Sequence, residues 1–206
     1  MSKRGAIYVY WGDRIEPELK RSIASIEQLN YAYKAFRLED YSNLNDKSKM
    51  FDLSPYETSL YLDTDTVVLQ DLEFGFEMAE RHGMAVCLAP FYCASRWGIE
   101  DIPEYNTGVI FFKKTAAVKS VFDRWQQIAH HYPNDQAGFA KAIYDLGFNP
   151  FVLPMNYNYR YDYHRGLFLC GKIKVWHSRE AIPDEVFKEH PVDCFWGLPP
   201  FDSLFS

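Results

Sequence analysis

The sequence of 206 residues lacks the features of several specialised protein classes. Its net charge of −6 provides no basic stripe to neutralise phosphates, so nucleic acid is not expected as a main partner. The first apolar stretch is broken at Gly12 and is too short for a signal-peptide core or a transmembrane segment. The four cysteines have neither Cys-x-x-Cys nor zinc-site spacing and are expected to be reduced thiols: Cys87, Cys93, Cys170 and Cys194. These absences predict a cytoplasmic protein and are compatible with peripheral membrane association.

What the composition does contain is typical of one domain that is rich in aromatic side chains. With 48% hydrophobic residues, the chain can form a substantial core, and we expect a single domain over residues 1–206. Aromatic residues make up 17% of the chain. Their faces suit sugar rings and nucleobases, but they also pack in ordinary cores, so composition alone does not decide the ligand.

Apolar runs typical of buried strands alternate along the chain with segments of helical periodicity. Pro17 marks the start of the first helix, and Thr115 caps the clearest one, which Pro133 ends. Strands are predicted at residues 6–11, 31–36, 59–62, 84–88, 108–112, 151–153 and 173–176, and helices at 17–30, 45–54, 71–81, 115–132 and 135–146. This alternation over one core predicts an α/β domain.

Two carboxylates, Asp63 and Asp65, lie between two apolar runs in the middle of the chain. A buried strand cannot hold unpaired carboxylates, because desolvating each one costs several kcal/mol unless a cation or strong donors compensate. We therefore expect the pair at the carboxyl end of a strand, where open α/β sheets bind their ligands. Two hard oxygen donors at that place suit Mg²⁺ or Mn²⁺ bound together with substrate phosphates. Two chemistries share this local pattern: nucleotide-sugar transfer, and phosphoryl transfer through an aspartyl nucleophile.

Several motifs in order resemble those of the retaining GT-A glycosyltransferases, the group of glycogenin and the bacterial lipopolysaccharide galactosyl- and glucosyltransferases. Residues 61–68 resemble the metal-binding Asp-x-Asp segment of that group, and 106–110 its Asn-x-Gly strand start. Residues 134–136 resemble the Asp-Gln pair beside the donor sugar, and 175–178 the late strand that ends in a metal-ligating His. The resemblance covers residues 7–178 and implies a GT-A (nucleotide-diphospho-sugar transferase) fold, with a mixed central sheet flanked by helices.

The resemblance also implies roles for the charged residues. Asp65 and His177 would bind the divalent ion, and Asp63 would share it and reach the ribose of the nucleotide. This mixed oxygen and nitrogen set suits Mn²⁺ better than Mg²⁺. A basic residue before the Asp-x-Asp segment would contact donor phosphate or sugar. Lys47 has nearly the expected spacing, and Lys49, which points to another helix face, is its competitor.

The remaining site residues follow from the same resemblance. Asp135 would hydrogen-bond hydroxyls of the transferred sugar, Gln136 would lie near its anomeric carbon, and Asn106 would hold a sugar hydroxyl. Tyr8, Tyr10 and Trp11, at the end of the first strand, occupy the nucleobase-binding position, and Tyr10 is the better candidate for a stacked ring. Helix capping, a strand turn and core packing are the ordinary structural alternatives for these residues.

The expected function is metal-dependent transfer of a hexose from a nucleotide-diphosphate sugar, for which we expect UDP, to an acceptor hydroxyl with retention. One departure is that the Gly and Lys-Pro-Trp-like segment of the family is absent after His177, so that a phosphate contact is either missing or supplied by Arg179. The alternatives are a haloacid-dehalogenase-type phosphatase and a non-catalytic protein of the same fold that binds carbohydrate or nucleotide-sugar. The first fits the residues 63–67 but has no later acidic pair for Mg²⁺.

Overall fold

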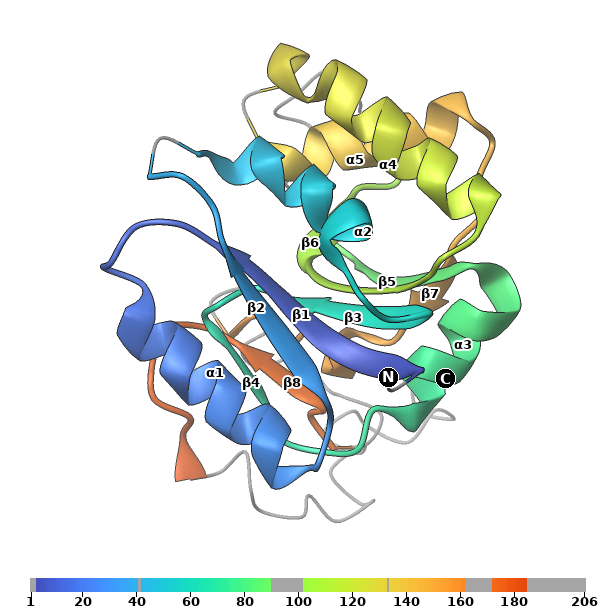
Figure 1. The fold of residues 1–206 in the computed structure, drawn as a ribbon. Helices are drawn as coiled ribbons and strands as arrows, with labels where there is room; N and C mark the ends of the chain where they lie inside the picture. The colour runs from blue at the N-terminus through green and yellow to red at the C-terminus, as the bar shows by residue number, and fades with distance from the viewer. Residues whose placement is uncertain (1–2, 41, 90–101, 133, 162–171, 185–206) are drawn as a thin grey trace, which may run out of the picture.

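A six-stranded sheet forms the centre of the computed structural model, which describes residues 3–40, 42–89, 102–132, 134–161 and 172–184 (Figure 1). The strand order is β2-β1-β3-β6-β5-β7. The strands are β1 Arg4–Tyr10, β2 Tyr33–Arg37, β3 Thr58–Leu62, β5 Met84–Leu88, β6 Tyr105–Lys113 and β7 Phe151–Leu153. All neighbouring pairs are parallel except the two that β6 forms with β3 and β5. The prediction of a mixed sheet is confirmed.

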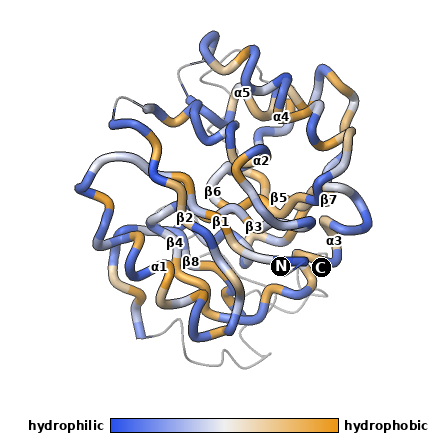
Figure 2. The backbone as a smooth tube through the Cα atoms, in the orientation of Figure 1, coloured by the Kyte–Doolittle hydropathy of each residue, from blue (hydrophilic) through white to orange (hydrophobic). Residues whose placement is uncertain are grey.

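Helices cover both faces of this sheet, so the central strands are buried on both sides. Along β1, Ile7 and Val9 face one core, and Ala6 and Tyr8 face the other. The helices are α1 Glu16–Gln28, α2 Met50–Leu53, α3 Glu73–His82, α4 Ala116–Ile128 and α5 Asp135–Asp145. Helices α2, α4 and α5 lie on one face and α1 and α3 on the other, and the apolar segments concentrate in the sheet between them (Figures 1 and 2).

Helix α4 shows how local sequence sets these elements. The Thr115 hydroxyl accepts the Val118 N–H and caps the helix, as predicted. The buried stripe includes Trp125, whose ring lies 4.8 Å from that of Phe139 on α5. The helix continues as a short 3₁₀ segment, η3 Ala129–His131. The pair α4 and α5 therefore packs through aromatic side chains over the sheet face that contains β6.

A separate two-stranded antiparallel sheet contains β4 Thr66–Val68 and β8 Val175–His177. Sequence analysis identified both apolar runs, but it did not predict that they pair with each other outside the main sheet. It was also wrong to start the last strand at Ile173. Helix α1 packs on β4, where the Ser25 hydroxyl accepts the Val68 N–H. This small sheet brings a late segment of the chain beside the carboxyl end of β3.

Two further differences from the sequence predictions concern helix ends. The helix predicted at 45–54 begins as a 3₁₀ segment, η1 Leu44–Lys49, because Asn43 and Asp46 form a capping box, and α2 follows it. Asn30 lies beyond α1 with φ of 59°, not on its apolar stripe. Cys87 is a buried free thiol, as expected, and the other three cysteines lie outside the described residues. No helix in the described part of the chain could span a membrane.

Candidate active site

Strand pairing brings three metal-ligand candidates together at the carboxyl end of β3. Asp63 follows β3 directly, and its backbone N–H donates to the carbonyl of Gly108 on β6. The chain then turns, with the Thr66 N–H donating to the Asp63 carbonyl, and enters β4. In the small sheet Thr66 pairs with His177, so the imidazole comes beside both carboxylates. We call Asp63, Asp65 and His177 the carboxylate–imidazole cluster.

The ligand atoms of this cluster lie within 4.8 Å of one another. His177 Nε2 is 3.2 Å from Asp65 Oδ1 and 3.7 Å from Asp63 Oδ2. Adjacent ligands of an octahedral ion bound at about 2.1 Å lie about 3 Å apart, so small adjustments would place all three on one ion. The cluster therefore fits a divalent cation in both geometry and donor type.

The electrostatics of Asp65 depend on this neighbour. Burial acts to raise the pKa of Asp65, but the hydrogen bond and charge of His177, together with the charge of Arg160, outweigh it and hold that pKa below its ordinary value. Asp65 is therefore ionised and available as a hard ligand at neutral pH. His177 Nε2 faces both carboxylates, and a histidine binds a metal ion through a ring nitrogen that carries no proton.

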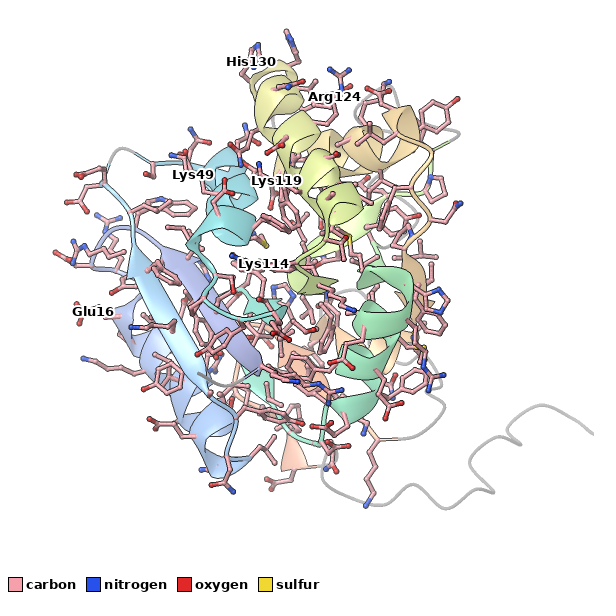
Figure 3. All side chains as sticks on the ribbon, turned by 45° about the vertical axis from the view of Figure 1, so that its right-hand side comes forward. Glu16, Lys49, Lys114, Lys119, Arg124 and His130 are labelled. Carbon is pink, nitrogen blue, oxygen red and sulfur yellow. The ribbon has the colours of Figure 1, made fainter. Side chains whose placement is uncertain are left out.

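A second cluster shares Asp63 and contains a buried cation. The Lys47 ammonium lies 2.7 Å from Asp63 Oδ1 and 3.0 Å from Asp135 Oδ2. Burial acts to lower the pKa of Lys47, but the charges of Asp135 and Asp63 outweigh it and raise that pKa above its usual value. Lys47 is thus charged, and we call Lys47, Asp63 and Asp135 the lysine cluster. Lys49, the competitor, is exposed and pairs with Asp46 on the outer side of η1 (Figure 3).

Asp135 is the first residue of α5, but it does not cap that helix. The side chain of Asn134 accepts the Ala137 N–H and serves as the cap, so the Asp135 carboxylate points into the site instead. There it accepts a hydrogen bond from the Thr107 hydroxyl as well as from Lys47. Burial acts to raise the pKa of Asp135, but Lys47 and Thr107 outweigh it and hold that pKa below its ordinary value.

The side chain of Gln136 is oriented by a carboxylate that sequence analysis did not select. Gln136 Nε2 donates to Glu104 Oε1 at 2.9 Å, immediately before β6. Glu104 is buried, and its Oε2 has no hydrogen-bond partner among the residues that the structure describes. Burial, and to a smaller extent the charge of Asp135, raises the pKa of Glu104. No spacing or motif in the sequence distinguishes this glutamate, because it acts only through a long-range contact.

A family model of nucleotide-diphospho-sugar transferases matches residues 48–181, which is more than half of the chain. The chain belongs to this family. The match spans Asp63, Asp65, Asp135, Gln136 and His177, and begins one residue after Lys47. A search among curated proteins finds no significant match.

Solved structures with glycosyltransferase folds are similar to this family member at low sequence identity. The apo-form glycosyltransferase GlyE of Streptococcus pneumoniae TIGR4 matches with a TM-score of 0.64 and 15% identity, covering 87% of this chain and 55% of GlyE. The galactosyltransferase LgtC in complex with donor and acceptor sugar analogues matches with a TM-score of 0.59 and 12% identity, covering 84% of this chain and 86% of LgtC. Mouse xyloside xylosyltransferase 1 matches with a TM-score of 0.54 and 12% identity, covering 87% and 99%. These similarities confirm the GT-A fold, and this chain spans about half the length of GlyE.

Asn106 and Gly108 of this family member support the carboxylate–imidazole cluster from β6. Asn106 Oδ1 accepts the Gly108 N–H at 2.9 Å and the Nδ2 group of Asn158 at 2.8 Å. A Cβ on Gly108 would lie 2.1 Å from His177 Cε1 and 2.9 Å from Asp63 Oδ2. Sequence analysis selected Asn106 for a sugar hydroxyl and gave no role to Gly108 or Asn158. Only a residue without a side chain fits at position 108.

The aromatic candidates for the nucleobase position differ in accessibility. Tyr8 is fully buried, and its hydroxyl accepts a hydrogen bond from Ser22, so its ring is not available for stacking in this structure. Tyr10 is half-buried at the carboxyl end of β1 and is the ring that a ligand can reach. Arg179, the expected substitute phosphate contact, is exposed and pairs with Glu18 on α1.

Proposed function

We propose that this protein is a metal-dependent glycosyltransferase that moves a hexose from a UDP-sugar to an acceptor hydroxyl with retention. The observation that carries the proposal is the convergence of Asp63, Asp65 and His177 next to the buried Lys47–Asp135 pair. This arrangement matches the demands of a diphosphate leaving group, which needs cations, beside a sugar, which needs hydrogen-bonding groups. The family match supports the same reaction class.

The cluster residues would hold Mn²⁺, or Mg²⁺, through two carboxylate oxygens and one imidazole nitrogen. A divalent ion bound there supplies Lewis-acid stabilisation of the departing diphosphate. Lys47 adds a fixed positive charge within 3.0 Å of both Asp63 and Asp135. In this proposal Asp63 also reaches the ribose, and Tyr10 contacts the nucleobase. These groups bind and orient the donor, so positioning supplies a large part of the catalysis.

On the sugar side, Asp135 would bind hydroxyls of the transferred hexose, and Gln136 would lie near its anomeric carbon. Glu104 accepts from Gln136 Nε2, so the carbonyl end of that amide is the end left for the site. An electron-rich oxygen there suits a sugar that develops positive charge. We assign no general base, and retention rests on the resemblance to retaining enzymes. GlyE is a glycosyltransferase and LgtC a galactosyltransferase, which is compatible with this proposal.

The two alternatives have less support. A haloacid-dehalogenase-type phosphatase would use Asp63 as a nucleophile on the first strand, whereas here Asp63 follows the third strand in chain order, β3. A non-catalytic protein would have no need for the lysine cluster beside a complete ligand set. The family match to nucleotide-diphospho-sugar transferases disfavours the phosphatase further.

The test is metal-dependent turnover of nucleotide-sugars. The purified protein is incubated with a panel of nucleotide-diphosphate sugars and Mn²⁺, without and with sugar acceptors, and release of the nucleotide diphosphate is measured. We expect slow hydrolysis of one UDP-sugar and faster release once an acceptor is present. Asp65→Ala should lower this rate by roughly 10³-fold, because the ion supplies several kcal/mol of charge stabilisation. The exposed Asp52→Ala is the control, with an unchanged rate.

Three outcomes would refute the proposal. Full activity in folded Asp65→Ala protein would remove the metal site from the reaction. Preferential hydrolysis of phosphomonoesters would favour the phosphatase. Binding of a nucleotide-sugar with no turnover under any metal would favour the non-catalytic alternative.

A further inference from the structure

A chain of hydrogen bonds leads from the backbone of β6 to the imidazole of His177. The Gly108 N–H donates to Asn106 Oδ1 at 2.9 Å, and Asn158 Nδ2 lies 2.8 Å from the same oxygen. Asn158 Oδ1 lies 2.7 Å from His177 Nδ1. We call these four groups the amide relay. All three side chains are buried, with exposures of 4%, 2% and 2% for Asn106, Asn158 and His177.

The orientation of every group in the relay follows from its first member. A backbone N–H can only donate, so the group of Asn106 that faces Gly108 must be its carbonyl oxygen. The partner of that oxygen on Asn158 must then be the NH₂ group, because two carbonyl oxygens would repel each other. The carbonyl end of Asn158 is therefore turned toward His177. An acceptor at 2.7 Å from Nδ1 requires that Nδ1 carries the proton.

We propose that Asn106 and Asn158 are positioning residues that fix His177 with its proton on Nδ1, leaving Nε2 as the nitrogen that binds a cation. Nε2 is the nitrogen that faces both carboxylates, at 3.2 Å and 3.7 Å. The inference rests on the proposed function only for the role of that cation in the reaction. It reassigns Asn106 from a sugar hydroxyl to the relay, because its oxygen accepts the two hydrogen bonds from Gly108 and Asn158.

The relay is needed because the neighbouring carboxylate favours a proton on Nε2 of His177, which is the nitrogen that must be free to bind a cation. Asp65 Oδ1 lies 3.2 Å from Nε2 and would accept a proton from it. Without Asn158, a neutral His177 would place its proton on Nε2, where it blocks the ligand position. Cation binding would then require a proton shift, which weakens affinity. Loss of such outer-shell partners typically lowers metal affinity about 10- to 100-fold.

The direct test is the tautomer of His177 in the metal-free protein. Protein with ¹⁵N-labelled histidine is studied by NMR at a pH above the titration of the imidazole, and the His177 signals are assigned from their absence in His177→Gln. We expect the proton on Nδ1 in the native chain. In Asn158→Ala and in Asn106→Ala we expect a shift of the proton to Nε2. The second variant leaves Asn158 in place and breaks only the far link of the relay.

Metal affinity provides the second readout, measured by calorimetric titration with Mn²⁺. Asn158→Ala should bind Mn²⁺ about 10- to 100-fold more weakly than the native chain. Asn156→Ala is the matched control, because Asn156 is another buried amide in the same segment but donates to the Lys172 carbonyl instead. This control should keep the native tautomer and an affinity within about twofold of the native one, well below the 10- to 100-fold loss set for an outer-shell partner.

The inference is overturned if the native protein has its proton on Nε2, or if Asn158→Ala keeps the native tautomer. It is also overturned if Asn158→Ala and Asn156→Ala lose the same affinity, since the effect would then reflect only a lost buried amide. The tautomer measurement on the native protein needs no metal and no change in the relay, only His177→Gln for assignment, so it decides the point even if Asn158→Ala does not fold. A native Nδ1 proton without any Mn²⁺-dependent sugar transfer would support the relay and reject the proposed function.

Discussion

The two halves of the site share Asp63 but treat charge in opposite ways. In the lysine cluster, each carboxylate has a buried ammonium at 2.7–3.0 Å. In the carboxylate–imidazole cluster, Asp63 and Asp65 face an imidazole nitrogen at 3.7 Å and 3.2 Å. In the first half, both carboxylates already share a cationic partner without any ligand. The second half gathers two negative charges and a lone-pair donor, and it is completed by a cation.

The charged side chains that belong only to the lysine cluster are more buried than the two carboxylates of the carboxylate–imidazole cluster. The side chains of Lys47 and Asp135 are each 7% exposed, whereas those of Asp63 and Asp65 are 20% and 23% exposed. A charge that water cannot reach must be paired inside the protein, while a partly exposed one can wait for a ligand. Substitutions in the lysine cluster should therefore reduce stability first, and those in the other cluster should reduce metal binding first.

The largest effect is expected from Lys47→Met. This change leaves Asp63 and Asp135 without their ammonium, and breaking a buried ion pair from one side costs about 3–5 kcal/mol. Urea denaturation measures the loss in the free energy of unfolding. The exposed Lys49→Met, two residues away, is the control, and its cost should stay within about 0.5 kcal/mol. Equal losses in the two variants would remove the distinction between the clusters.

The same variant should change the acid side of the stability curve. Despite burial, Lys47 and Thr107 hold the pKa of Asp135 below its ordinary value of 3.8. A depressed folded-state pKa stabilises the protein above the unfolded pKa, and the contribution is lost as the pH falls through the folded one. Native stability should thus decline as the pH falls below about 4. Lys47→Met should show a weaker decline from this group, and an unchanged decline would contradict the assignment.

A smaller effect is expected when Mn²⁺ is added to the native protein. A ligand that binds only the folded state at 100 times its dissociation constant stabilises it by about 2.7 kcal/mol. Thermal denaturation with Mn²⁺ and with a chelator measures this difference. Asp65→Ala should lose the Mn²⁺ effect but keep its metal-free stability, which is the reverse of Lys47→Met. Stabilisation of Asp65→Ala by Mn²⁺ to the native extent would place the ion elsewhere.

Gly108→Ala should lower the metal affinity of the carboxylate–imidazole cluster by steric overlap alone, without changing any charge. The added Cβ would overlap His177 Cε1 and crowd Asp63 Oδ2, so both ligands must move. We expect Mn²⁺ affinity to fall about 10- to 100-fold, as for other losses of ligand support, which equals about 1.4–2.7 kcal/mol. Calorimetric titration measures this change. Gly138→Ala in α5 is the control and should leave affinity unchanged, because the atoms nearest to its Cβ belong to Trp125 and Ala129 and not to a metal ligand.

The parts of this site that the sequence predicts are those with a local signal. Asp63 and Asp65 interrupt apolar runs, and a strand buried on both faces reads as a continuous apolar segment, so β3 and its end were predictable. Lys47 was preferred over Lys49 on spacing, and the structure places Lys47 inward and Lys49 in solvent. The fold class followed from alternating strands and helices, and the family match confirms it.

The parts that could not be predicted depend on contacts between distant segments. The pairing of β4 with β8 joins residues more than 100 positions apart, and nothing in three-residue strands specifies that partner. Asn158 acts through two hydrogen bonds and Glu104 through one, all with residues that are distant in sequence, and single amides or carboxylates carry no spacing signal. Tyr8 was selected for the nucleobase position although it lies in the core. An aromatic residue in a strand has the same sequence signal whether it faces a ligand or the core.

The smallest effect is expected from Glu104→Gln, and it distinguishes orientation from binding. The carboxylate can only accept, so it holds the NH₂ end of Gln136; a glutamine at position 104 could instead donate and turn the Gln136 carbonyl away from the sugar. Loss of one oriented hydrogen bond is worth about 0.5–1.5 kcal/mol, so kcat should fall by roughly tenfold or less. Donor KM should stay nearly constant, since the amide acts at the reacting carbon. Steady-state kinetics measure both quantities.

A double variant with Glu104→Gln and Gln136→Ala tests whether Glu104 acts only through Gln136. If it does, Gln136→Ala alone should match the double variant. A further loss in the double variant would show that Glu104 acts on the substrate itself, through the Oε2 atom that has no partner in the described structure.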